Sequence, residues 1–135
     1  MTLAETYTPV GIPEIDDEHK QVLQQLQDLA TAASGNVDLP SLLERAARFA
    51  EKLAHHFAAE EALMSVLDAA DRQRHTREHR RMIERCRSQL SRATESSVVS
   101  DWASLVAKWL IAHHVDEDLL LGLALLRPKS GPPTP

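Results

Sequence analysis

Apolar residues recur every three or four positions along most of this chain, which is the period of an amphipathic α-helix. The first periodic stretch follows Asp16, which we interpret as an N-cap with Ile15 as a hydrophobic staple, and it stops at the Ser34-Gly35-Asn36 cluster. The pattern predicts a first helix between these points. Its inward face holds His19, Val22, Leu23, Leu26, Leu29, Ala30 and Ala33.

The longest periodic stretch begins near Leu39 or Pro40, where proline is tolerated in the first turn, and is predicted to run to about Leu67. Its inward stripe consists of Phe49, Leu53, His56, Glu60, Leu63 and Leu67. His55 and Glu61 fall outside this stripe and are expected to be solvated. An imidazole and a carboxylate four residues apart on an apolar stripe must be hydrogen-bonded, paired or metal-bound, because their unpaired burial is costly.

Two further helices are predicted after a break at residues 68–71 and after a serine-rich loop at residues 94–100, where Ser100 or Asp101 supplies the cap. The inward residues of the third helix are His75, His79, Met82, Cys86 and Leu90, and those of the fourth are Trp102, Leu105, Val106, Trp109 and His113. The fourth helix is expected to end near Gly122. Four amphipathic helices with short loops predict an all-α, antiparallel, up-down-up-down four-helix bundle.

Proline and glycine mark the two ends of the chain. Pro9, Gly11 and Pro13 predict an extended N-terminal arm, and the proline-rich end predicts a disordered C-terminal tail. We therefore divide the chain into a bundle domain over residues 1–122 and a tail over residues 123–135.

Composition narrows the partners and the location. The 135-residue chain has a net charge of −5 with both signs interspersed, so we expect no nucleic acid and no membrane as partner. The single cysteine, Cys86, excludes an internal disulfide and fits a reducing compartment. No signal peptide is recognisable, and we expect a cytoplasmic monomer.

In an antiparallel bundle, the inward histidines of all four helices fall at the same end. His19 lies near the start of the first helix and His113 near the end of the fourth, level with the residues that the two middle helices contribute. Five buried imidazoles with a carboxylate among them would be costly without a cation, whereas neutral imidazole is a natural ligand for a transition metal. The pattern therefore predicts a metal site between the helices.

At these residues the chain resembles the hemerythrins, in particular the bacterial single-domain type. The resemblance is carried by Gly11-Ile12-Pro13-Glu14-Ile15-Asp16-Asp17-Glu18-His19-Lys20, by His56-Phe57 with Glu60, by the pair His75 and His79, and by Trp109-Leu110-Ile111-Ala112-His113 followed by Asp118. It spans roughly residues 10 to 120.

The resemblance implies a non-haem di-iron centre with an oxo or hydroxo bridge. His75, His79 and His113 would bind one iron, His19 and His56 the other, and Glu60 and Asp118 would bridge the two. One iron would then be five-coordinate, and dioxygen would bind at its open position, for oxygen storage, delivery or sensing. The alternative is a di-iron enzyme that reduces peroxide, dioxygen or nitric oxide, because such an enzyme uses the same ligands.

Two features do not follow from the spacing alone. From His113 the carboxylate at i+4 is Glu117, whereas Asp118 at i+5 leaves that face of an ideal helix, so its assignment requires a local irregularity. His114 stands where the family usually has an aliphatic residue. It is either a partly exposed ring or a proton donor to the bound oxygen ligand. By the resemblance, Phe57, Trp109 and Leu110 would wall the dioxygen pocket.

Overall fold

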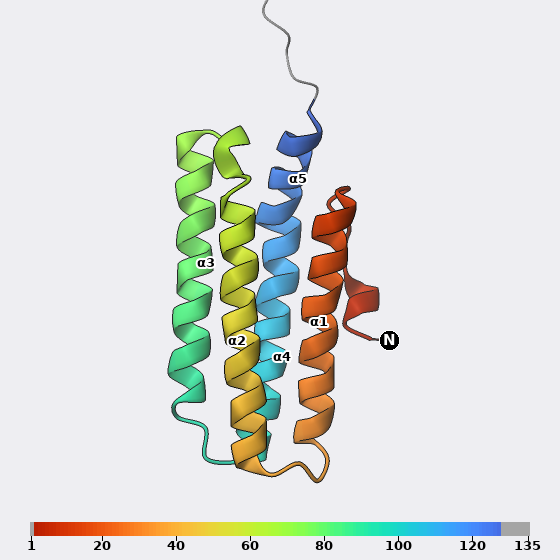
Figure 1. Ribbon diagram of the computed structural model, residues 1–135, viewed down its shortest axis with the longest axis vertical. Coiled ribbons are helices and arrows are strands. Elements are labelled where there is room, and N and C mark those ends of the chain that lie inside the picture. Colours follow the sequence, from red (N-terminus) through yellow and green to blue (C-terminus); the bar gives the residue numbers. More distant parts are fainter. Residues whose placement is uncertain (1, 128–135) are drawn as a thin grey trace, which may run out of the picture.

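Four long helices run side by side with alternating direction in the computed structural model, which describes residues 2–127 (Figure 1). They are α1 (Pro13–Ala33), α2 (Leu39–Glu61), α3 (Ala69–Leu90) and α4 (Ser96–His113). Each helix packs against the next along the chain, and α4 returns to pack against α1. Residues 2–127 contain no strand, so the predicted antiparallel four-helix bundle is confirmed. None of their helices is long and apolar enough to cross a membrane.

The first residues of the helices test the N-caps that the sequence predicted. Asp38 caps α2, as its side chain accepts the Ser41 backbone N–H at 3.2 Å, and α2 begins at Leu39 as predicted. The prediction that Asp16 is an N-cap was wrong, because α1 already begins at Pro13, whose fixed φ suits the first helical position. The prediction that α4 starts at Ser100 or Asp101 was also wrong. α4 starts at Ser96, and the burial of Val99 outweighs the weak helix preference of the serines around it.

The second helix ends earlier than its apolar period suggests. α2 stops at Glu61 rather than near Leu67, and a 3-10 turn, η2 (Met64–Val66), reverses the chain toward α3. The turn buries Met64 and Leu67, while Leu63, predicted to face inward, is 42% exposed. Asp68 then caps α3 by accepting the Asp71 backbone N–H at 2.8 Å.

The last helix contains the local irregularity that the ligand spacing requires. After α4 the chain forms a π-helical turn, η3 (His114–Asp118), in which the N–H of Leu119 bonds to the carbonyl of His114 five residues earlier. It then continues as α5 (Leu119–Leu126). The helical structure therefore ends at Leu126 and not near Gly122, and the part of the predicted tail beyond Arg127 lies outside the described residues.

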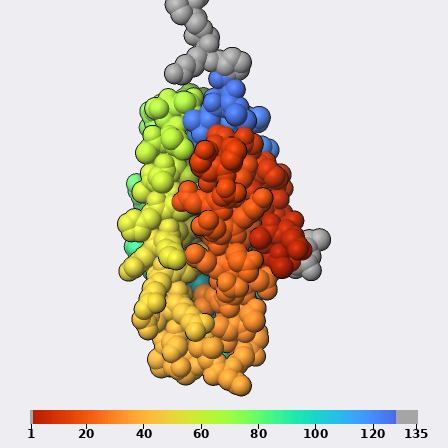
Figure 2. All heavy atoms as spheres, turned by 45° about the vertical axis from the view of Figure 1, so that its right-hand side comes forward, coloured from red at the N-terminus to blue at the C-terminus, as the bar shows by residue number. Residues whose placement is uncertain are grey.

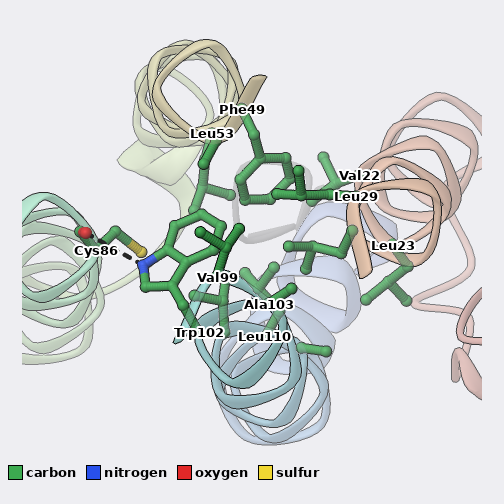
Figure 3. Close-up of a cluster of buried hydrophobic side chains, with 14 of the residues drawn as sticks. Val22, Leu23, Leu29, Phe49, Leu53, Cys86, Val99, Trp102, Ala103 and Leu110 are labelled. Atoms are coloured by element: carbon green, nitrogen blue, oxygen red, sulfur yellow. Dashed lines mark hydrogen bonds between the residues drawn. The ribbon is translucent and has the colours of Figure 1, made fainter. Parts of the chain in front are cut away.

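Two apolar clusters lie on either side of the layer of inward polar residues near one end of the bundle. The larger one fills the bundle, and its side chains from α1, α2 and α4 interdigitate as Figure 3 shows, with the Trp102 indole N–H donating to the Cys86 carbonyl at 3.1 Å. Cys86 is a buried free thiol in this cluster. The smaller cluster joins η2 to α5 through Met64, Leu67 and Leu121. Along α2 and α4, the inward polar residues fall between the two clusters.

The N-terminal arm lies along the flank of α1 (Figure 2). It is not extended throughout, because Ala4–Thr6 form a short 3-10 turn, η1. Tyr7 and Val10 are buried. The arm also passes very close to α5: a Cβ on Gly122 would lie 2.6 Å from the Val10 carbonyl oxygen, so only glycine allows this approach.

Candidate metal centre

Eight buried polar side chains gather in one layer between the two apolar clusters. Each is at most 4% exposed: His19, His56, Glu60, His75, His79, His113, His114 and Asp118. The first helix contributes one of them, α2 and α3 two each, and the end of α4 with the π-helical turn the remaining three. The structure thus brings together all seven residues that the resemblance implied as ligands, and adds His114.

Three imidazoles from α3 and α4 converge on one point. The Nε2 atom of His113 lies 3.1 Å from that of His75 and 3.0 Å from that of His79. Two nitrogens bound at about 2.1 Å to one six-coordinate metal would lie about 3 Å apart, so the spacing matches adjacent ligands. Ligand atoms of these three residues, Glu60 and Asp118 all lie within 4.8 Å of one another, close enough to share a metal ion.

Glu60 faces two histidine groups at once. Its Oε1 atom lies 2.9 Å from Nε2 of His19 and makes a close contact with Nε2 of His56. Its Oε2 atom points to the other group, 3.6 Å from Nε2 of His79 and 3.8 Å from Nε2 of His75. One carboxylate therefore presents a separate oxygen to each group.

Asp118 is placed in the same way by the π-helical turn. Its Oδ1 atom lies 2.9 Å from Nε2 of both His75 and His113, while Oδ2 lies 3.3 Å from Nε2 of His19. The wider turn brings residues five apart onto one face, which an α-helix does not. The other carboxylate that the spacing allowed, Glu117, instead pairs with Arg74 at 2.9 Å.

Several buried nitrogen and oxygen atoms in this layer have no hydrogen-bond partner among the described residues. They are Oε2 of Glu60, Nδ1 of His75, His79 and His114, and Oδ2 of Asp118, whereas the ring nitrogens of His56 contact Glu60 and Glu18. Leaving so many polar atoms unpaired would cost about 1–3 kcal/mol each, which is unusual in one small layer. Imidazole nitrogens with carboxylate oxygens are also a donor set suited to iron and other transition metals. The residues therefore fit a bound metal.

The electrostatics of the histidines also favour a cation. Burial and the neighbouring His113 lower the pKa of His79 to about 2. Burial also acts to lower the pKa of His113, but the acceptors Asp118 and Glu78 outweigh it and raise that pKa to about 10. In the absence of metal, a proton on His113 therefore disfavours protonation of His79. Nε2 of His113 lies within 3.1 Å of Nε2 of both His75 and His79, and its single proton can be donated to only one of them at a time. A metal ion would satisfy these nitrogens together.

An outer layer of side chains orients the inner ones, and the sequence analysis missed it. The Tyr7 hydroxyl donates to Oδ1 of Asp16 at 2.5 Å, so it accepts from Nδ1 of His19 at 2.8 Å. Nδ1 of His113 donates to Glu78 at 2.8 Å. Such partners fix the tautomer and ring orientation of a ligating histidine. Asp16 shares a helix face with His19, a signal that could have been found, whereas nothing in the sequence connects Tyr7 to the site.

Asp16 is held as a carboxylate by the arm. Besides the Tyr7 hydroxyl, the backbone N–H groups of Val10 and Gly11 donate to it at 2.7 and 3.2 Å. Burial alone would raise the pKa of Asp16, but these hydrogen bonds outweigh burial and lower it. Desolvation, the bond to Asp16 and its negative charge raise the pKa of Tyr7 well above its ordinary value, so the phenol keeps its proton.

The remaining predicted site residues occupy different surroundings. Phe57 stacks on His79 with ring centroids 3.8 Å apart and an angle of 4° between the planes. Leu110 belongs to the larger apolar cluster, and Trp109 is partly exposed, with the Arg85 guanidinium 5.5 Å from its ring centre. His114 is 2% exposed, so the interpretation as a partly exposed ring was wrong.

A bundle of four antiparallel helices with buried histidines and carboxylates at one end defines a helical cation-binding protein. The chain belongs to the hemerythrin family, since its residues 10–125 match the model of the hemerythrin HHE cation binding domain. Comparisons with curated proteins and with solved structures gave no match.

Proposed function

We propose that this protein holds two iron ions with an oxo or hydroxo bridge and binds dioxygen reversibly. The observation that carries the proposal is the arrangement of the two carboxylates. Glu60 turns one oxygen toward His19 and the other toward His79, and Asp118 divides its oxygens between His75 and His19. A single metal ion would leave one oxygen of each carboxylate without use, whereas two ions use all four.

The histidines divide unequally between the two ions. His75, His79 and His113 would hold one ion, and His19 and His56 the other, with Glu60 and Asp118 bridging both. The second ion would thus have fewer protein ligands and would offer a position to an external molecule. Held by these residues, two ferrous ions would supply the electrons for reversible binding of dioxygen.

The role of the surrounding chain in this function is to exclude water and fix the ligands. Phe57 covers His79 face to face, and an apolar cluster lies on each side of the layer. Tyr7 and Glu78 hold His19 and His113 in their orientations. Apolar surroundings and fixed ligands would favour the return of dioxygen over its reduction, since reduction needs protons from outside.

Two measurements test the proposal. Protein expressed with ample iron should contain two irons per chain by elemental analysis; one metal ion per chain, or zinc alone, would refute it. The reduced protein should then develop a stable visible band in air that disappears when oxygen is removed.

Rapid conversion of the reduced protein to the diferric form in air would instead favour the enzyme alternative. In that case turnover with peroxide, dioxygen and nitric oxide should be measured next. The same spectrum therefore separates an oxygen-binding protein from a di-iron reductase.

A further inference from the structure

His114 is a sixth buried histidine in the layer, in addition to the five that the proposed di-iron centre uses. It is the first residue of the π-helical turn and is 2% exposed. Its ring lies nearly parallel to that of His19, with centroids 4.0 Å apart and 17° between the planes, and it meets the ring of Tyr7 edge-on at 5.2 Å. It is therefore enclosed by residues that belong to the centre.

Hydrogen bonding does not explain why this imidazole is buried. A buried histidine normally finds a partner for its ring nitrogens, but within residues 2–127 Nδ1 of His114 has none. Nε2 lies 3.7 Å from Oδ2 of Asp118, which is too far for a hydrogen bond. That oxygen has no donor either. Nε2 of His114 and Oδ2 of Asp118 thus face each other across a gap too wide for a hydrogen bond, and Nδ1 on the other side of the ring has no partner.

The size of that gap fits two ligands of one metal ion. Atoms bound at about 2.1 Å to a six-coordinate ion lie about 3 Å apart when adjacent and about 4.2 Å apart when opposite. The 3.7 Å between His114 and Asp118 falls between these limits, and His19 lies 3.3 Å from the same oxygen. Ligand atoms of His19, His114 and Asp118 all lie within 4.8 Å of one another.

We propose that His114 is a sixth histidine ligand, bound to the metal ion that His19 and His56 hold, at the position otherwise open to an external molecule. This inference rests on the proposed di-metal centre and refines it. Each ion then has three histidines and one oxygen from each carboxylate. An external ligand such as dioxygen binds only when His114 leaves the metal, so His114 lowers the affinity of the site for small molecules.

The size of the effect follows from the fraction of time that the position is free. If His114 occupies it for about nine-tenths of the time, the apparent affinity for an external ligand falls about tenfold. Replacing the imidazole with an apolar side chain removes this competitor without adding a new ligand. His55 offers a matched control, because it neighbours His56 in the chain but is exposed.

The test compares the wild-type protein with His114→Leu and His55→Leu, each loaded with cobalt(II) and titrated with azide. His114→Leu should bind azide about tenfold more tightly or better, and its d–d absorption should intensify because one ion changes from six to five ligands. His55→Leu should match the wild type in both respects. Equal azide affinity and equal absorption in all three loaded proteins would overturn the proposal.

A second measurement needs no variant and covers the case in which His114→Leu fails to fold. In the proton NMR spectrum of the cobalt(II) protein, each ligating imidazole gives one strongly shifted, exchangeable N–H signal. Six such signals support the proposal, and five refute it.

Failure of the proposed function would look different. A wild-type protein with two metal ions and six signals, whose iron form shows no reversible oxygen band, would refute oxygen binding but keep the ligand role. A wild-type protein that binds no metal would refute both.

Discussion

The Tyr7 hydroxyl connects the N-terminal arm to the metal centre, and Tyr7→Phe removes this connection with little change in shape. The hydroxyl makes two buried hydrogen bonds, at 2.5 Å to Asp16 and at 2.8 Å from His19. Without it, Nδ1–H of His19 is buried with no acceptor, which costs about 1–3 kcal/mol. Because His19 then lacks the partner that fixes its ring, the metal affinity should fall about 10- to 100-fold.

Two assays separate these effects. Urea unfolding of the metal-free protein gives the loss of stability, and competition with a chelator gives the metal affinity. Thr6→Val is a matched control, because it deletes a hydroxyl of the same arm that only bonds the Leu3 carbonyl at the surface, and it should change stability by no more than about 0.5 kcal/mol. If Tyr7→Phe is less stable but holds metal as tightly as the wild type, the reasoning about His19 is wrong and Tyr7 merely anchors the arm.

Three further predictions concern other parts of the molecule. His79→Ala should lose metal, whereas His55→Ala should keep the wild-type content by elemental analysis. Gly122→Ala should destabilise the protein by about 1–3 kcal/mol in urea despite its better helix propensity, because the new Cβ meets the arm, whereas Gly35→Ala, with its nearest contact at 3.6 Å, should not. The pKa of Asp16 is lower in the folded protein than in the unfolded chain, so its carboxylate stabilises the fold above about pH 4. This stabilisation is lost as the pH falls through the folded pKa. In urea unfolding of the metal-free protein, Asp16→Asn should therefore lack this part of the pH dependence.

The sequence predicted the helices better than their ends, for a physical reason. Apolar periodicity reports burial, and burial continues where a helix has already stopped. Met64 and Leu67 are buried by a 3-10 turn rather than by α2, so the period alone extended that helix too far. At the start of α4 the opposite happened: serines suggested a loop, but the buried Val99 draws them into the helix.

The inner layer of the site was accessible from the sequence to different degrees. His56 and Glu60 follow from the helical period, because residues four apart share a face. His113 also follows from the period of its helix, but Asp118 required the family resemblance, since an ideal helix turns residues five apart onto different faces. The outer partners Tyr7 and Glu78 had no spacing signal, because they meet the ligands only through tertiary packing.

The π-helical turn also sets how α5, which follows it, is rotated about its own axis. One additional residue rotates the rest of a helix by about 100°, so the turn decides which side of α5 faces the bundle. The same rotation that brings Asp118 beside His113 directs Gly122 toward Val10 of the arm. Val115 and Asp116 are exposed, yet deleting either one would move a ligand and the docking surface of the arm together. These two positions act as spacers, where the number of residues is constrained and their identity is free.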